Sequence, residues 1–201
     1  MWFVEGKGTT NAIYILRIIT ERSTEVGQDL YFCFIDYTKA FDTVKHEEIM
    51  NMLQDINVDG KDLRIIRNLY WQQTAAIRIE SEISEYQKIK KGVRQGCVLS
   101  PDLFSLYSEV IMRKIENMPG IAIGGHNINN LRYADDTVLM ATSEIDLQEL
   151  VDVINEESEK LGLGLNKKKT ETMVISKKKE TPRCNIQLNG TTLKQEKTSN
   201  I

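Results

Sequence analysis

The sequence is poor in the residues that build disulfides, zinc sites and membrane spans. Only three cysteines occur in 201 residues, Cys33, Cys97 and Cys184, and they are far apart, odd in number and without a CxxC pattern. The two histidines, His46 and His126, have no other soft metal ligand near them, which argues against zinc. The N-terminus has no signal-peptide pattern, and no apolar run approaches the ~20 residues of a membrane helix. We therefore expect reduced thiols and a soluble, intracellular protein of the nucleus or cytoplasm.

The chain also lacks the excess of positive charge that is typical of proteins that bind nucleic acids. Lysine and arginine number 26 against 29 acidic residues, which gives a formal net charge of −3. The charge is unevenly distributed, with basic clusters at 167–169 and 177–179, for which a solvated surface is the favoured explanation. The 41% of hydrophobic residues allow a sizeable core, and we find neither an internal repeat nor a proline-rich linker. One domain, or one domain with a lobe, is expected.

Hydrophobic spacing predicts alternating helices and strands. Helices are expected at residues 11–22, 46–56, 62–71, 101–116 and 143–161. The run at 30–35 is typical of a strand buried on both faces, and further strands are expected at 75–80, 86–90, 131–133, 137–140 and 172–175. Ser100 is predicted to cap the helix that begins at Pro101, and a turn is expected at Asn189-Gly190. This order predicts an α+β fold, in which helices pack on one face of a mixed or antiparallel sheet.

Three carboxylates stand where such a fold can bring them together. Asp36 ends the buried strand, and Asp135 and Asp136 form the tip of a predicted hairpin. If the two strands are neighbours, the three carboxylates converge and repel one another. Hard divalent cations relieve that repulsion, and two of them can clamp the attacking and leaving oxygens of a phosphoryl transfer. A polar turn is the simpler explanation of an isolated Asp-Asp pair.

Four segments resemble the palm motifs of reverse transcriptases from non-LTR (LINE-type) retrotransposons, and they occur in the order found in that family. They are FCFIDYTKAFD (32–42), GVRQGCVLSP (92–101), LRYADDT (131–137) and GLGLNKKKTE (162–171). The segment GKGTTNAI (6–13) is similar to the end of a fingers motif of the same family. The resemblance extends over about residues 3–175.

The resemblance implies the palm of a right-hand polymerase, an antiparallel sheet with helices on one face, together with part of the fingers. It divides the chain into the end of the fingers (1–29), palm (30–60), a fingers-side helix and hairpin (61–91), palm (92–176) and a truncated connection toward a thumb (177–201). The rest of the fingers, the primer grip and the thumb of the family have no counterpart in these 201 residues. We therefore expect a partial reverse transcriptase domain.

The same resemblance implies roles for individual residues. Asp36, Asp135 and Asp136 match the aspartates that hold two Mg²⁺ ions, for which Mn²⁺ is an alternative. Lys169 matches a lysine that can protonate the departing pyrophosphate, although the run of three lysines leaves open which one serves.

Other positions match the part of the family site that receives the incoming nucleotide. Phe41 stands where an aromatic ring packs under the sugar and disfavours a 2′-hydroxyl, and core packing is the alternative role of that ring. Four more residues are nucleotide-binding candidates, namely Gln95, Gly96, Arg94 and Lys7. The family has an arginine at the position of Val4, and a lysine at position 7 does not replace a forked guanidinium.

The implied function is RNA-directed DNA polymerase activity of a retrotransposon-derived protein. Its partners would be an RNA template, a DNA primer and dNTPs, without a membrane. One alternative is a truncated remnant of low or no activity that acts at most as a nucleic-acid-binding domain. A non-catalytic scaffold that reuses the palm is another, and a metal-dependent nuclease is a third, for which the Gln95-Gly96 pair and Phe41 have no obvious purpose.

Overall fold

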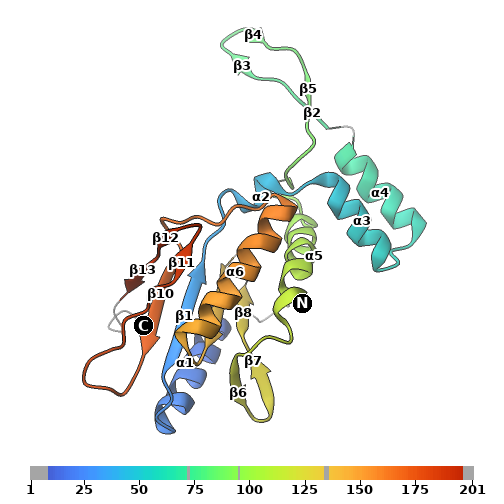
Figure 1. Cartoon of the computed structure of the whole chain (residues 1–201). Coiled ribbons are helices and arrows are strands. Elements are labelled where there is room, and N and C mark those ends of the chain that lie inside the picture. The colour runs from blue at the N-terminus through green and yellow to red at the C-terminus, as the bar shows by residue number, and fades with distance from the viewer. Residues whose placement is uncertain (1–8, 72, 95, 134–135, 197–201) are drawn as a thin grey trace.

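The computed structural model describes residues 9–71, 73–94, 96–133 and 136–196. Its centre is a five-stranded sheet in the order β13-β10-β1-β9-β8 (Figure 1). The strands are β1 (Leu30–Ile35), β8 (Asn130–Tyr133), β9 (Asp136–Ala141), β10 (Glu171–Ile175) and β13 (Lys194–Glu196). The first four pair antiparallel, while β13 joins the edge parallel to β10. The predicted α+β fold is confirmed, and β1 lies at the centre of its sheet.

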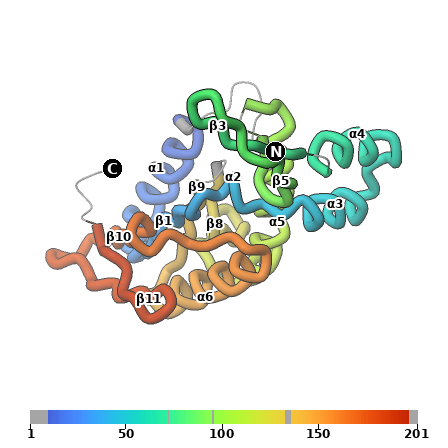
Figure 2. The backbone as a smooth tube through the Cα atoms, turned by 90° about the horizontal axis from the view of Figure 1, so that it is seen from above, coloured from blue at the N-terminus to red at the C-terminus, as the bar shows by residue number. Residues whose placement is uncertain are grey.

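Helices cover both faces of this sheet. The helices of the described residues are α1 (Thr9–Glu25), α2 (Ala40–Thr43), α3 (His46–Asp55), α4 (Gly60–Trp71), α5 (Ser100–Met112), the 3₁₀ helix η1 (Arg113–Ile115) and α6 (Glu144–Leu161). Of these, α3 and α4 lie beside α5, away from the sheet (Figure 1). Seen from above, α1 lies on one side of the sheet and α6 on the other (Figure 2). Side chains of a strand alternate between its faces, so Cys33 and Ile35 pack in the core with α5 and α6, whereas Leu30 and Phe32 pack with Ile19 of α1. Sequence alone did not predict the helix on the second face.

The cysteines are free thiols, as expected. Burial raises the pKa of the Cys33 thiol far above its usual range, and burial together with the nearby Glu144 raises the pKa of Cys184 to about 11. Both thiols therefore stay protonated near neutral pH, which makes them poor nucleophiles. Cys33 and Cys184 serve as packing residues of the core.

The hairpin predicted between α4 and α5 is present as an arm that projects from the body of the molecule (Figure 1). Its ladder is split into two short pairs rather than two continuous strands. β2 (Thr74–Ala75) pairs with β5 (Gln87–Lys88), and β3 (Arg78–Ile79) pairs with β4 (Glu82–Ile83). All four strands are exposed. Without a buried face, nothing enforces a long ladder, which explains the difference from the prediction.

Two further hairpins and the helix ends complete the fold. β6 (Ile121–Ile123) pairs with β7 (His126–Ile128), and β11 (Gln187–Leu188) pairs with β12 (Thr191–Thr192). The second hairpin turns at Asn189-Gly190, both with positive φ, as predicted. Ser143 accepts a hydrogen bond from the Asp146 N–H and so caps α6. Within the described ranges, no helix is both long and apolar enough to cross a membrane.

The start of α5 differs from the prediction. The helix begins at Ser100, and Leu99 occupies the cap position without a side-chain hydrogen bond. The Ser100 hydroxyl instead donates to the carbonyl of Arg94 at 2.6 Å. This bond fastens the loop before α5 to the first turn of the helix, so Ser100 orders the loop rather than the helix end.

Candidate active site

The ends of two neighbouring strands bring distant carboxylates together. β1 pairs with β9 in a register that sets Ile35 opposite Thr137. Extending that register by one residue sets Asp36 opposite Asp136, so the first and the last carboxylate of the predicted set meet at one end of the sheet. The side chain of Asp36 is 36% exposed, and Asp136 is exposed as well. Two carboxylates from segments 100 residues apart therefore face the same region of solvent.

Asp36 is held in place by the segment that follows α6. The Asn166 backbone N–H donates to the Asp36 carbonyl at 2.8 Å, and the Asn166 side-chain amide donates to Oδ2 of the carboxylate at 3.0 Å. The Asp36 N–H in turn donates to the Thr170 hydroxyl at 3.3 Å. One residue further on, Tyr37 forms a β-bridge with Leu165. These bonds fix both the backbone and the carboxylate of Asp36.

One lysine of the cluster at 167–169 is directed at the carboxylates. Lys169 Nζ lies 3.7 Å from Asp36 Oδ1, and its side chain is 69% exposed. Lys167 instead donates to the carbonyl of Asn189, and Lys168 is exposed. Geometry thus distinguishes among three lysines that sequence left equivalent, and it favours Lys169.

A second predicted group lies on the loop from residue 92 to α5. The Val93 N–H donates to the Phe41 carbonyl at 2.8 Å, which docks the loop on α2. Gly92 has a φ of +92°, and a Cβ there would lie 3.3 Å from the Asp42 carbonyl, so glycine permits this close approach. The Phe41 ring is half-buried and lies 4.7 Å, centre to centre, from the ring of Phe104.

The other nucleotide-binding candidates are only partly described. Arg94 is exposed, and Gly96 has a φ of +78° with open space around its Cα. Asp135, Gln95 and Lys7 lie outside the described residues. Among the residues that are described, no three acidic, cysteine or histidine side chains form a cluster suited to a metal ion. The described pair of carboxylates offers the hard oxygen donors that Mg²⁺ prefers.

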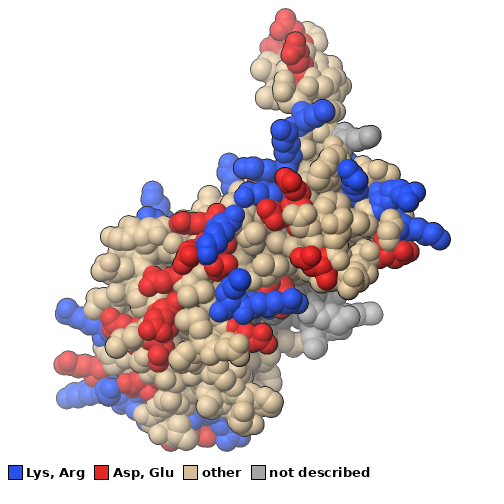
Figure 3. Space-filling model, turned by 45° about the vertical axis from the view of Figure 1, so that its right-hand side comes forward, with Lys and Arg blue, Asp and Glu red and all other residues tan. Residues whose placement is uncertain are grey.

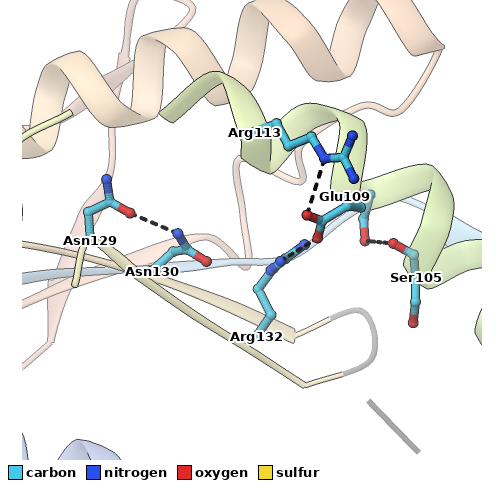
Figure 4. Close-up of polar contacts among 7 residues, drawn as sticks. Ser105, Glu109, Arg113, Asn129, Asn130 and Arg132 are labelled. Carbon is cyan, nitrogen blue, oxygen red and sulfur yellow. Dashed lines mark hydrogen bonds and ion pairs between the residues drawn. The ribbon is translucent and has the colours of Figure 1, made fainter. Parts of the chain in front are cut away.

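A partly buried ion pair supports the hairpin that β8 and β9 form. Arg132, one residue before the tip motif Tyr133 to Asp136, reaches from β8 to α5, where its Nη2 lies 2.7 Å from Glu109 Oε2 (Figure 4). The Arg132 side chain is only 12% exposed. The exposed Arg113, the first residue of η1, also pairs with Glu109, with its Nε 3.5 Å from Glu109 Oε1. At the start of β8, buried Asn129 donates to the carbonyl of Ile115, so the hairpin is tied to the helix layer at two levels.

Sequence analysis missed the residues that support the carboxylates. Asn166 and Thr170 lie within the motif at 162–171, close to Lys169. Their polar side chains at these positions could have indicated that they support Asp36. The pairing of Arg132 with Glu109 had no such signal, because charged residues are common on helices and the two are 23 positions apart.

A sheet of antiparallel strands with carboxylates at one end and helices packed against it is the arrangement expected for the palm of a right-hand polymerase. The model of the family "Reverse transcriptase (RNA-dependent DNA polymerase)" matches residues 3–199. The chain therefore belongs to the reverse transcriptase family.

Similar proteins agree with this assignment. A Pol polyprotein of the type-1 retrotransposable element R2 from Nasonia vitripennis is 25% identical over 86% of the chain and 17% of its own length. One from Popillia japonica is 31% identical over 71% of the chain and 20% of its own length. The chain spans about a fifth of these relatives. In fold it is similar to apo telomerase from Candida tropicalis, with a TM-score of 0.64 and 17% identity over 87% of the chain and 33% of that protein.

Proposed function

We propose that the chain is the palm, with part of the fingers, of an RNA-directed DNA polymerase from a retrotransposon-derived protein. It would add dNTPs to the 3′-hydroxyl of a DNA primer on an RNA template, inside the cell. The observation that carries this proposal is the register of β1 with β9, which pairs the positions of Asp36 and Asp136 beside Lys169. Membership of the reverse transcriptase family supports it.

The domain division follows from the same proposal. Residues 30–60 and 92–176 would form the palm, 1–29 and 61–91 the fingers side, and 177–201 the connection toward a thumb. The place of α4 and of the arm, both away from the sheet, supports their assignment to the fingers side (Figure 1). Because β13 pairs with β10, the last of these segments also contributes a strand to the palm sheet.

The donor set suits two Mg²⁺ ions, with Mn²⁺ as the alternative, held by Asp36, Asp135 and Asp136. When bound, such ions stabilise the charge on the attacking and leaving oxygens of the transfer. The role of Asn166 is to hold the Asp36 carboxylate through Oδ2 in a fixed orientation, because ligands that are oriented by a hydrogen bond need no rearrangement on binding. Thr170 does the same for the backbone of Asp36.

We propose that Lys169 protonates the departing pyrophosphate. Its ammonium group lies within 4 Å of Asp36 and remains largely exposed, so it can reach a phosphate bound at the carboxylates. Phe41 would lie under the sugar of the incoming nucleotide, with its ring supported by Phe104. Arg94, Gln95, Gly96 and Lys7 complete the proposed nucleotide site.

Primer extension tests the function directly. The chain is incubated with an RNA template, an annealed DNA primer, Mg²⁺ and dNTPs, and the products are separated on a sequencing gel. We expect template-directed extension that stops when EDTA removes the divalent cation. A protein that folds and binds the primer–template, but extends it with neither Mg²⁺ nor Mn²⁺, would contradict the proposal and favour the inactive remnant.

Phe41→Val is expected to weaken the preference for dNTPs. The smaller side chain leaves room for a 2′-hydroxyl, so the ratio of kcat/KM for dGTP to that for GTP should fall by about 10- to 100-fold. The matched control is Phe104→Leu, which removes the same ring contact from the other side. That variant should lose stability but keep its preference, and an equal loss of preference in both would assign Phe41 to packing alone.

A further inference from the structure

A cluster of lysines lies where the arm joins the body of the molecule. A cavity of about 460 Å³ is lined there by Lys45, Lys88, Lys90, Lys91 and Trp71, together with His46, Glu47 and Ile89. We call the four lysines and Trp71 the basic neck. Figure 3 shows basic side chains gathered below the tip of the arm.

Backbone pairing fixes the arrangement of the basic neck. Lys45 precedes α3 and forms an antiparallel β-bridge with Lys91. The His46 N–H donates to the Lys90 carbonyl at 3.3 Å, and the buried His46 ring contacts the Gly92 carbonyl at 2.7 Å. The segment that carries three of the lysines is therefore held against the start of α3, and the cluster does not depend on flexible side chains meeting by chance.

The lysines of the basic neck outnumber the acidic residues beside them, since Glu47 is the one carboxylate among the residues that line the cavity. Within the described part of the chain, no carboxylate lies within ion-pairing distance of Lys88, Lys90 or Lys91. Some lysines elsewhere on the surface do have such partners, as Lys160 has Glu156 and Lys178 has Asp29. A chain with a net charge of −3 thus keeps a concentrated positive charge at one place, which is the electrostatic pattern of a phosphate-binding surface.

An aromatic ring completes the surface. Trp71 ends α4 and is 44% exposed, an uncommon exposure for so large an apolar ring. The guanidinium of Arg67 lies 5.3 Å from the ring centre, which holds the ring in one orientation. An exposed ring beside unpaired lysines offers stacking for a base and charge for the neighbouring phosphates. The bases of a duplex are already stacked on one another, so only an unpaired strand can use Trp71 in this way.

We propose that the basic neck binds single-stranded nucleic acid, with one base stacked on Trp71 and the adjoining phosphates on Lys88, Lys90 and Lys91. None of these residues belongs to the proposed catalytic or nucleotide-binding set. The site therefore adds a grip on an unpaired strand that works without the carboxylates.

Trp71 provides its own reporter. The chain has two tryptophans, so Trp2→Phe leaves Trp71 as the only one. Titrating this variant with a single-stranded RNA oligonucleotide should quench its fluorescence. With three phosphate contacts, the logarithm of the affinity should fall with the logarithm of salt concentration with a slope of about −2.

Variants then separate the two kinds of contact, with a fluorescein-labelled RNA and anisotropy as the readout. Trp71→Leu should weaken binding by about 5- to 150-fold, and the triple change Lys88→Gln, Lys90→Gln and Lys91→Gln should bring the salt slope close to zero. The matched control changes three exposed lysines elsewhere, Lys61→Gln, Lys114→Gln and Lys179→Gln. That control and Asp136→Asn should both keep the affinity of the unaltered chain.

Three results would overturn the proposal. Equal loss of binding in the control triple variant would assign the effect to overall charge. If duplex RNA or heparin competes as well as the single strand while Trp71→Leu keeps the affinity of the unaltered chain, the basic neck binds polyanions in general. Quenching by poly-glutamate at the same affinity as by RNA would indicate an acidic protein partner instead. Circular dichroism and melting temperature confirm that each variant is folded.

Discussion

Asp36→Asn and Asp136→Asn are each expected to reduce primer extension by at least about 10³-fold. The amide keeps the size of the side chain but removes the negative charge that we propose binds Mg²⁺. Metal ions contribute several kcal/mol to such transition states, and about 1.4 kcal/mol corresponds to each factor of ten in rate. Single-turnover kcat at saturating dNTP is the measurement, because it excludes effects on product release.

Asp42→Asn provides the matched control. Asp42 lies in the same motif, on α2, and is exposed, but it is not among the residues proposed to hold metal. Its variant should extend primers at nearly the unaltered rate, with the same dependence on Mg²⁺ concentration. Normal activity of Asp136→Asn, or an equal defect in all three variants, would show that the carboxylate assignment is wrong.

Breaking the ion pair between Arg132 and Glu109 is expected to lower kcat by about 100-fold without changing the ligands of the proposed metal site. Arg132 is next to the proposed catalytic motif, and Glu109 lies on α5, which follows the proposed nucleotide loop. Displacements of about 1 Å can cost two orders of magnitude in rate. We therefore expect Glu109→Gln to reduce single-turnover kcat while KM for dNTP changes little.

Stability measurements separate positioning from unfolding. Because Glu109 is 35% exposed, solvent screens the pair, and a loss of about 1–3 kcal/mol in the free energy of unfolding is expected in urea. Arg113→Gln removes the other, exposed partner of Glu109 and should change both rate and stability only slightly. Arg132→Lys keeps the positive charge but lacks the two-pronged guanidinium. It should therefore lose less of the rate than Glu109→Gln does. A rate loss in Arg113→Gln as large as in Glu109→Gln would rule out the positioning role.

Local patterns predicted the elements that form the site. The unbroken apolar run at 30–35 is a strand buried on both faces, and the two short apolar runs at 131–133 and 137–140 lie in the paired strands β8 and β9. Once these strands were predicted, the family motifs predicted that the three aspartates lie at the strand ends. The motif named Lys169 but did not separate it from Lys167 and Lys168, and only the 3.7 Å distance from its Nζ to Asp36 Oδ1 does so. The structure describes two of the aspartates and Lys169.

Contacts between distant elements were not predictable in the same way. Strand register is fixed by side chains on both partners, so no single segment shows that Asp36 stands opposite Asp136. Likewise, the apolar stripe of α1 indicates a buried face but not which side of the sheet it covers. The arm is a third case, because its alternating residues satisfy a strand pattern although none of them is buried.

The central position of β1 has a consequence for how the protein folds. Ile35 pairs with Thr137 and Leu30 with Ile175, so both neighbours of β1 are made more than about 100 residues after it. At ribosomal rates of about 5–20 residues per second, β9, the first partner of β1, is synthesised on the order of 5–20 s after β1. During that time an apolar strand with two unpaired edges is exposed, which favours aggregation. Chaperone dependence of the nascent chain should therefore be greatest before residue 141 has emerged.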